Sequence, residues 1–300
     1  MYPSSSRQTP AVSLEFFPPK GLSAERALMT GAHVLRRFAP AFQTVTFGAD
    51  GSAIDGSLDW PARLQSLNEV PTAAHLTLCQ FDSPSEFLDH ADALWQQGIK
   101  HLVVLRGDTN SASQPLPFAD VAHAVAALKS QHNYEISVAA YPEGHPMAAN
   151  LRSDLAVLRD KQEAGADRAI TQFFFDNATY FRFLDSARLA GVKMEIVPGI
   201  MPINNIWRVA GFARKCGADM PQSLLDRFSA LGDDPEAHTE LAREVVCDQV
   251  RELREQGVDA IHIYTLNRVD LTADTIRAFQ NVDQIETTTN HEKPRLALAS

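Results

Sequence analysis

Short apolar runs alternate along the chain with longer stretches in which hydrophobic residues recur at helical spacing. Eight of the short runs are rich in β-branched and aromatic residues, are bounded by turn-forming residues and are predicted to be strands. Most have no polar face, as expected for a parallel sheet that is covered on both sides. The predicted strands are Val12–Phe17, Thr44–Gly48, Ala73–Leu78, His101–Arg106, Ile136–Tyr141, Arg168–Phe174, Met194–Pro198 and Ala260–Thr265.

Helical patterns fill the segments between these strands, so that strands and helices alternate. The segment from Asn204 to Gln256 is unusually long and has room for three helices before the last strand. The other predicted helices are Ala24–Phe38, Asp59–Leu67, Ser85–Gln97, Phe118–Ser130, Asp154–Ala164 and Thr179–Ala190.

A small repeat supports this alternation. Four helical patterns end in a glycine that lies within three residues of the next predicted strand, namely Gly98, Gly165, Gly191 and Gly257. Each glycine suits the left-handed cap that closes a helix before a short turn. Eight βα units in about 270 residues predict an α/β fold of the (β/α)8 TIM-barrel type, a single domain with extra helices before the last strand. An open doubly wound sheet is the alternative, and the absence of a GxGxxG motif weakens it.

The two ends of the chain differ from this pattern. Residues 1–10 and 281–300 are polar and aperiodic, so we expect mobile tails on either side of a catalytic barrel at residues 11–280.

Composition narrows the possible partners and compartments. The chain has 27 Lys and Arg residues against 37 Asp and Glu, a net charge of −10, which argues against nucleic acid or an anionic membrane as a partner. The three cysteines, Cys79, Cys216 and Cys247, are far apart and form no CxxC motif, so neither a disulfide framework nor a zinc site is indicated. No apolar run approaches the roughly 18 residues that span a bilayer, and we expect a cytoplasmic protein.

The carboxyl ends of barrel strands line the active site in this type of fold. Polar residues stand at nearly every such end, which predicts a functional rim. Taken singly, His75 could be a core histidine, Asp108 the N-cap of a turn and Gln172 a partner of the backbone. The strand ends carry Glu15, Thr46, His75, Thr77, Arg106, Gly107, Asp108, Tyr141, Pro142, Glu143, Gly144, His145, Gln172, Pro198, Gly199, Tyr264 and Arg268.

Glu15 stands out because it lies in a strand that two prolines terminate. In an isolated strand a glutamate is expected on the solvated face. On the rim of a barrel it would instead lie in an apolar pocket with a raised pKa, able to donate a proton near neutral pH. A hydrogen bond from Ser13 or Thr46 would oppose this and favour the anion.

Other chemistries are less well supported. No lysine lies at the carboxyl end of a predicted strand, which disfavours a Schiff-base aldolase. The rim has no HxH pair, and the chain contains neither HExxH nor GxSxG. Metal-dependent hydrolysis would need His75, Asp108, Glu143 and His145 in an unfamiliar arrangement. Arg106 and Asp108 together suit a planar, hydrogen-bonding ligand ring.

Eight segments, in order along residues 11–280, resemble the methylenetetrahydrofolate reductase family in its short bacterial form. They are Ser13–Pro19, Val45–Ala49, Ala74–Thr77, Leu105–Asp108, Ser137–Pro146, Asp167–Asp176, Pro198–Pro202 and Tyr264–Arg268.

The resemblance implies an oxidoreductase of one-carbon metabolism whose (β/α)8 barrel holds FAD without a Rossmann motif. It implies ping-pong chemistry in one shared pocket, where NADH or NADPH reduces the flavin and 5,10-methylenetetrahydrofolate is then reduced to 5-methyltetrahydrofolate. It also implies a homo-oligomer. The alternatives are a flavin-free barrel lyase or metal-dependent hydrolase, and a barrel that only binds a partner.

Roles follow from the resemblance position by position. Glu15 matches the general acid that protonates a folate nitrogen, and Asp108 matches the carboxylate that binds the pterin and tunes the flavin. The matching substrate-binding positions are Asp108, Gln172, Arg208, Phe212, Tyr264 and Arg268. The matching FAD positions are Thr46, Phe47, Ala49, His75, Arg106, Gly107, Asp108, Ala119, Tyr141, His145, Asp154 and Lys161.

Three positions depart from the family pattern. Val157 and Asp160 replace polar or basic groups near the nucleotide end of FAD, and a carboxylate beside a pyrophosphate is unfavourable. We therefore expect Arg159 or Lys161 to supply the missing cation. Arg208 replaces a folate-binding glutamine, and the hypothesis is that its cation engages the glutamate tail of the substrate.

Overall fold

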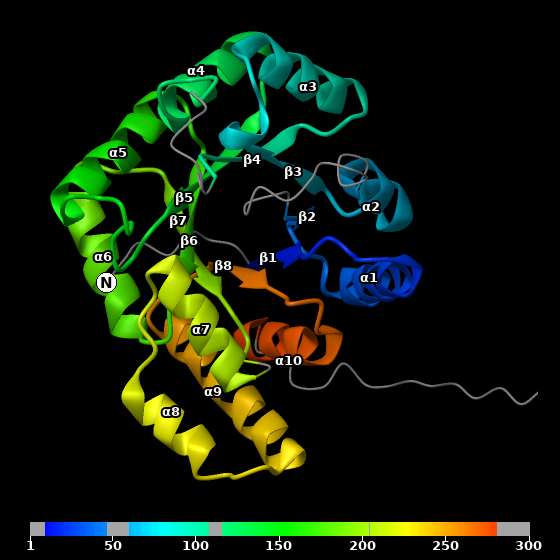
Figure 1. Cartoon of the computed structure of the whole chain (residues 1–300), viewed down its shortest axis with the longest axis vertical. Coiled ribbons are helices and arrows are strands. Elements are labelled where there is room, and N and C mark those ends of the chain that lie inside the picture. Colours follow the sequence, from blue (N-terminus) through cyan, green and yellow to red (C-terminus); the bar gives the residue numbers. More distant parts are fainter. Residues whose placement is uncertain (1–9, 47–59, 108–115, 204, 281–300) are drawn as a thin grey trace, which may run out of the picture.

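The computed structural model describes residues 10–46, 60–107, 116–203 and 205–280. Eight parallel strands close into a barrel in chain order, and the last strand pairs with the first (Figure 1). This confirms the predicted (β/α)8 barrel. The strands are β1 (Ala11–Phe16), β2 (Phe42–Val45), β3 (Thr72–Thr77), β4 (His101–Leu105), β5 (Glu135–Ala140), β6 (Arg168–Phe173), β7 (Glu195–Ile200) and β8 (Ala260–Tyr264).

All eight predicted strands are present, but the second was misplaced. The prediction Thr44–Gly48 began two residues late, because Phe42 and Gln43 are also buried strand residues, and Phe47 and Gly48 lie outside the described residues. Because Gln43 is polar, the pattern of apolar residues did not identify it as part of a strand. Its side-chain amide is buried against Asn68, to which it donates a hydrogen bond of 2.7 Å.

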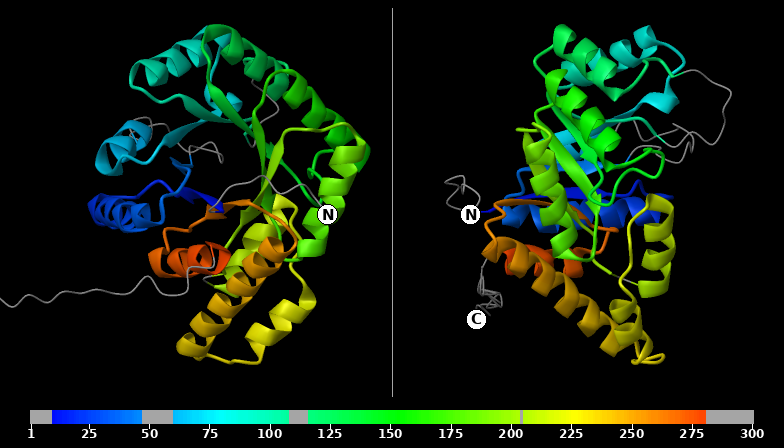
Figure 2. Two further views of the ribbon diagram at one scale, coloured as in Figure 1. Left: turned by 180° about the vertical axis from the view of Figure 1, so that it is seen from behind. Right: turned by 90° about the vertical axis from the view of Figure 1, so that its left-hand side faces the viewer.

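Helices surround the strands, and the long segment before the last strand contains three of them, as predicted. Figures 1 and 2 show α8 and the neighbouring end of α9 projecting beyond the helical ring. The helix that follows β8 was not among those predicted. The helical segments are α1 (Leu22–Leu35), η1 (Arg36–Phe38), α2 (Trp60–Asn68), η2 (Leu78–Gln80), α3 (Pro84–Gln96), α4 (Val121–Gln131), α5 (Leu151–Glu163), α6 (Asn177–Leu189), α7 (Ile206–Cys216), α8 (Gln222–Ser229), α9 (Pro235–Glu255) and α10 (Val269–Gln280).

Strand alternation separates two cores. Val12, Leu14 and Phe16 of β1 are each only 1% exposed and belong to the large core between the strands and the helices. A second, small apolar cluster consists of Phe42, Ala73, Val103 and Ile170, with Leu105 packed against it. The second cluster contains few apolar residues. This leaves other positions on the same strands for polar side chains.

An arginine occupies the amino-terminal end of the barrel. Arg168 forms ion pairs with Glu135 and Glu195, at 2.5 and 3.6 Å, and its guanidinium lies 5.4 Å from the ring centroid of Phe42. His101 lies next to this arginine. Burial and the positive charge of Arg168 lower the pKa of His101 to about 3, so its imidazole is neutral at physiological pH. This end of the barrel therefore serves stability, as expected for the rim opposite the active site.

The four predicted cap glycines all have left-handed backbone, with φ of +83° at Gly98, +108° at Gly165, +89° at Gly191 and +92° at Gly257. Within the described residues, no helix is both long and apolar enough to cross a bilayer.

Two glycines with open space around them allow a test of the cap. A Cβ at Gly257 or at Gly211 would meet no atom within 4 Å, but only Gly257 has a left-handed backbone. We expect Gly257→Ala to lower the free energy of unfolding by about 1–2 kcal/mol. Gly211→Ala, inside α7, should raise it by about 0.5–1 kcal/mol. The urea midpoint of unfolding measures the change in stability for each substitution. Equal effects of the two substitutions would contradict the left-handed cap at Gly257.

Candidate active site

Glu15 points into the barrel because it alternates along β1 with the outward-facing Leu14 and Phe16. Only 13% of its side chain is exposed. The solvated-face interpretation is therefore wrong, and a buried carboxylate lies at the carboxyl-terminal end of the first strand.

Side chains on or directly after three other strands surround this carboxylate. The hydroxyl of Thr46, just after β2, donates a hydrogen bond of 2.7 Å to Oε1 of Glu15. Nε2 of His262, on β8, lies 3.2 Å from Oε2, and Nε2 of His75, on β3, lies 3.6 Å from the same oxygen. Two of these contacts are within hydrogen-bonding distance, and the third is an electrostatic contact.

These neighbours decide the charge of Glu15. Burial alone would raise its pKa, but charge interaction with His75 and hydrogen bonds from His262 and Thr46 outweigh burial and lower the pKa to about 2. The predicted raised pKa is therefore wrong for this pocket, where Glu15 is an anion at neutral pH. The predicted hydrogen bond from Thr46 is confirmed. Ser13 instead bonds His262.

His75 is a buried histidine with unused hydrogen-bonding capacity. Neither ring nitrogen has a hydrogen-bond partner among the described residues. Burial lowers the pKa of His75, and the charge of Glu15 opposes this shift. Buried polar groups in proteins are rarely left unpaired, and these nitrogens therefore point to a polar ligand or water.

The turn between β8 and α10 clamps the backbone of β1. The backbone N–H and the hydroxyl of Thr265 both donate to the carbonyl of Glu15, at 2.9 and 2.8 Å. Asn267 accepts a hydrogen bond from the N–H of Phe17 and donates one to its carbonyl. Leu266 and Asn267 adopt left-handed backbone, with φ of +48° and +56°. Such strain in residues other than glycine is typical of functional turns.

Tyr264 crosses the rim to the neighbouring strands. Its hydroxyl donates to the carbonyl of Thr171 at 2.9 Å, and burial raises its pKa. Gly199 makes this crossing possible, because a Cβ there would lie 2.7 Å from the ring and 2.2 Å from the carbonyl oxygen of Thr171. The hydroxyl of Tyr264 is therefore already engaged by the backbone of β6.

The predicted substrate residues of β6 and α7 lie on the same side of the barrel. Gln172 accepts a hydrogen bond from the adjacent N–H of Phe173, so the backbone alternative holds for its carbonyl oxygen. Phe212, which is 40% exposed, stacks on Phe173 with ring centroids 5.6 Å apart. Arg208 lies four residues before Phe212 on α7 and is exposed, as is Arg268. The β6–α7 face therefore combines aromatic surface with the exposed cation of Arg208.

Most of the predicted FAD positions follow β2 to β5. Arg106 directly follows β4, and its Nη1 lies 3.0 Å from the sulfur of Met147. The rings of Tyr141 and His145 meet edge to face at 4.5 Å, and the N–H of His145 donates to Asp154. Gly107 adjoins Arg106, and Ala119 is exposed just before α4. Phe47, Ala49 and Asp108 lie outside the described residues.

The structure separates the two cations expected near the FAD nucleotide. Nζ of Lys161 is buried and donates a hydrogen bond of 2.9 Å to the carbonyl of Ala139, in β5. Arg159 instead pairs with Glu163, and its Cδ lies 3.9 Å from the Cβ position of Gly191, in the turn before β7. That turn is at the amino-terminal end of the barrel. The expectation that Arg159 serves the rim is therefore not supported, because its side chain extends toward the opposite end.

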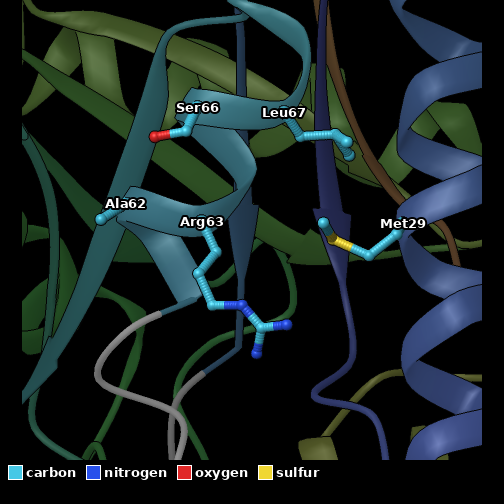
Figure 3. Close-up of a pocket in the computed structure, with 5 residues that line it drawn as sticks. All are labelled: Met29, Ala62, Arg63, Ser66 and Leu67. Atoms are coloured by element: carbon cyan, nitrogen blue, oxygen red, sulfur yellow. The ribbon is translucent and has the colours of Figure 1, made fainter.

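Two cavities lie outside this cluster. One, of about 450 Å³, is lined by Met29 of α1 and by Arg63 and Leu67 of α2 (Figure 3). The other, of about 1050 Å³, contains Glu143 and residues of α6, α8 and α9. Burial raises the pKa of Glu143, which accepts a hydrogen bond from the N–H of Asp219. Among the described residues, no group of three or more His, Cys, Asp or Glu side chains is arranged to hold a metal.

Comparison with known proteins identifies the family. The family model described as methylenetetrahydrofolate reductase matches residues 3–280. The chain belongs to this family. The 5,10-methylenetetrahydrofolate reductases of Pectobacterium carotovorum and Escherichia coli are each 38% identical to it over 262 residues, covering 87% of this chain and 87% and 88% of theirs. An Arabidopsis thaliana methylenetetrahydrofolate reductase (NADH) is 33% identical, and its alignment covers only 47% of the plant chain.

A solved structure shares the fold at much lower sequence identity. A Clostridium thermocellum protein, described as binding two copies of 5-methyl-5,6,7,8-tetrahydrofolic acid, has a TM-score of 0.62 and 14% identity. The similarity covers 92% of this chain and 96% of that one. At this identity the similarity supports the barrel fold alone.

His262 and Ser13 contribute to the site of this reductase-family barrel, although neither was among the predicted site residues. His262 is two residues before Tyr264 on β8 and therefore faces the same side of the strand. The two-residue spacing between His262 and Tyr264 was the sequence signal that could have identified His262 as a site residue. The flanking Ile261 and Ile263 make the segment resemble an ordinary buried strand.

Lys161 provides a pH test of the site. Burial lowers its pKa from 10.5 to about 8, although Asp154 and Asp120 oppose the shift. Between these pH values the unfolded chain binds one more proton than the folded chain, so stability rises with pH, by up to about 3 kcal/mol from this group. Urea unfolding near pH 8 and near pH 10.5 should show that Lys161→Met removes this rise, whereas Lys193→Met, at an exposed position, should retain it. If stability rises with pH in Lys161→Met as it does in the wild type, the amino group of Lys161 is not the buried group responsible for the rise.

Proposed function

We propose that this member of the methylenetetrahydrofolate reductase family interconverts 5,10-methylenetetrahydrofolate and 5-methyltetrahydrofolate, with FAD as cofactor and NADH or NADPH as reductant. The observation that carries the proposal is the carboxylate of Glu15, buried at the rim and contacted by Thr46, His75 and His262. A proton donor or acceptor is needed at a folate nitrogen when the five-membered ring opens or closes, and Glu15 is the group that we propose for this role.

The residues at the ends of β2 to β5 fit a flavin nucleotide. His75 has ring nitrogens without a partner among the described residues, and Arg106, directly after the neighbouring strand β4, adds hydrogen-bond donors. The hydroxyl of Thr46 already donates to Glu15, so it can only accept a hydrogen bond from a flavin. Lys161 adds a cation near the end of β5. A bound flavin would supply hydride transfer, taking a hydride from NADH or NADPH and giving one to the one-carbon unit of folate. Two substrates that use one pocket in turn would give ping-pong kinetics.

Glu15 must exchange a proton with the substrate during this reaction. Its hydrogen bonds favour the anion, so in the reducing direction it must first take up a proton. A folate that covers the pocket excludes water, which disfavours the charged carboxylate and promotes this uptake. In the opposite direction the anion is already the form that accepts a proton from the folate nitrogen.

The remaining predicted residues would hold the substrates around Glu15. The stacked rings of Phe173 and Phe212 offer an apolar surface to a pterin or a nicotinamide. Arg208 is exposed near this surface, where its cation suits the carboxylates of a folate glutamate tail. Asp108 and Gln172 would bind the pterin, and Arg268 would bind another part of the folate.

Glu15→Gln separates the two halves of the proposed reaction. The amide cannot donate a carboxyl proton, so folate turnover should fall about 10²–10⁴-fold while flavin reduction by NADH or NADPH continues at the wild-type rate. Stopped-flow absorbance measures each half-reaction. Glu143→Gln, at a carboxylate with a raised pKa outside the Glu15 cluster, is the control and should leave both unchanged. Wild-type rates for both half-reactions in Glu15→Gln would show that Glu15 is not the acid.

The colour of the purified protein tests the function itself. We expect oxidised-flavin absorbance that NADH or NADPH bleaches and methylenetetrahydrofolate restores. A colourless protein that does not take up added FAD would instead favour the flavin-free lyase or hydrolase.

A further inference from the structure

We propose that Ser13 and His262 act together as positioning residues that orient the carboxyl group of Glu15 for proton transfer. The inference extends the proposed function, because it assumes that Glu15 is the group that exchanges a proton with the folate. Neither residue is proposed to touch a substrate.

The three side chains form a continuous hydrogen-bonded row. Oγ of Ser13 lies 2.8 Å from Nδ1 of His262, and Nε2 of the same ring lies 3.2 Å from Oε2 of Glu15. Ser13 and His262 are opposite each other in the β1–β8 register, and Glu15 is two residues further along the same face of β1. One imidazole therefore bridges two side chains of the neighbouring strand. Ser13 is 4% exposed and His262 is fully buried, so water does not compete for these bonds.

The chemistry of the row selects one arrangement of protons. An ionised carboxylate can only accept hydrogen bonds, so Nε2 of His262 must carry a proton toward Glu15. In the tautomer that has its single proton on Nε2, Nδ1 is then an acceptor, and the hydroxyl of Ser13 donates to it. The other acceptor near this hydroxyl, the carbonyl of Ile261, is 3.4 Å away and therefore weaker. Ser13 thus holds His262 in the tautomer that donates to Glu15.

The other groups that face Glu15 do not replace this bond. Thr46 holds Oε1, the opposite carboxyl oxygen. His75 lies 3.6 Å from Oε2 and makes no hydrogen bond to it, and the hydroxyl of Tyr264 donates elsewhere, to Thr171. Among the described residues, the side-chain hydrogen bond to Oε2 therefore comes from His262, and His75 adds only an electrostatic contact. Loss of the Ser13 hydroxyl should weaken the hydrogen bond from His262 to Oε2. The pKa of Glu15 should then rise, and its carboxyl group should be less well oriented for proton transfer.

The barrel contains a matched control for this pair. His101 and Ser137 are also buried and also lie 2.8 Å apart, from Nε2 to Oγ, but neither contacts Glu15. Ser137→Ala thus removes an equivalent hydroxyl–imidazole bond in the same barrel. Any effect that appears in Ser13→Ala and not in Ser137→Ala belongs to Glu15 rather than to packing. Ser13→Thr, which retains a hydroxyl, tests rescue.

The experiment measures the pKa of Glu15 directly in the purified full-length protein. Glutamate labelled with ¹³C at the side-chain carboxyl is titrated by NMR, and the signal of Glu15 is assigned by its absence in Glu15→Gln. We expect Ser13→Ala to raise the pKa of Glu15 by about one unit, a tenfold change in proton affinity. Ser137→Ala should leave it unchanged, and Ser13→Thr should restore it.

Kinetics on the same proteins complete the test. Ser13→Ala should slow the folate half-reaction about tenfold and shift its pH profile toward higher pH, with flavin reduction unchanged. Equal Glu15 titrations in Ser13→Ala, Ser137→Ala and wild type would overturn the inference. A wild-type protein that lacks the folate half-reaction would instead overturn the proposed function, while the titration would still decide whether the pair controls Glu15.

Discussion

The buried negative charge of Glu15 is the constraint on which the site depends. A carboxylate removed from water must receive hydrogen bonds from the protein or take up a proton. The donors here come from the strands on either side, Thr46 after β2 and His262 on β8. His262 could not reach Glu15 in an open sheet that began at β1, because that strand would lack the β8 neighbour. A closed barrel therefore provides the two-sided support that this charge requires.

The same constraint explains why the two ends of the barrel differ. At the amino-terminal end the charges of Arg168, Glu135 and Glu195 are paired with one another. At the carboxyl-terminal end the ring nitrogens of His75 have no hydrogen-bond partner in the part of the chain that the structure describes, and Leu266 and Asn267 hold a strained backbone. Unsatisfied groups and strain reduce stability, and they gather where a ligand can make use of them. The barrel is thus stabilised at one rim and kept available for binding at the other.

Much of this architecture could be predicted from sequence, and the remainder could not for definable reasons. Apolar runs and cap glycines such as Gly165 report local structure, so strand order and the burial of Glu15 followed from them. His262 was missed because its role depends on a register between the first and last strands, which no local pattern reports. The charge of Glu15 was mispredicted because it results from opposing effects of burial and donors. The direction of Arg159 depends on where its side chain lies along α5, which composition does not reveal.

The seam between β1 and β8 also has a consequence for the order of events in folding. Glu15 and His262 are 247 residues apart in the chain, and the clamp from Asn267 to Phe17 spans 250. During synthesis from the amino terminus, Glu15 is made long before the strand that supplies its donor. Contacts of such separation form late, because their loop entropy must be overcome first. The docking of the last strand therefore completes the fold and sets the protonation state of the site in a single step.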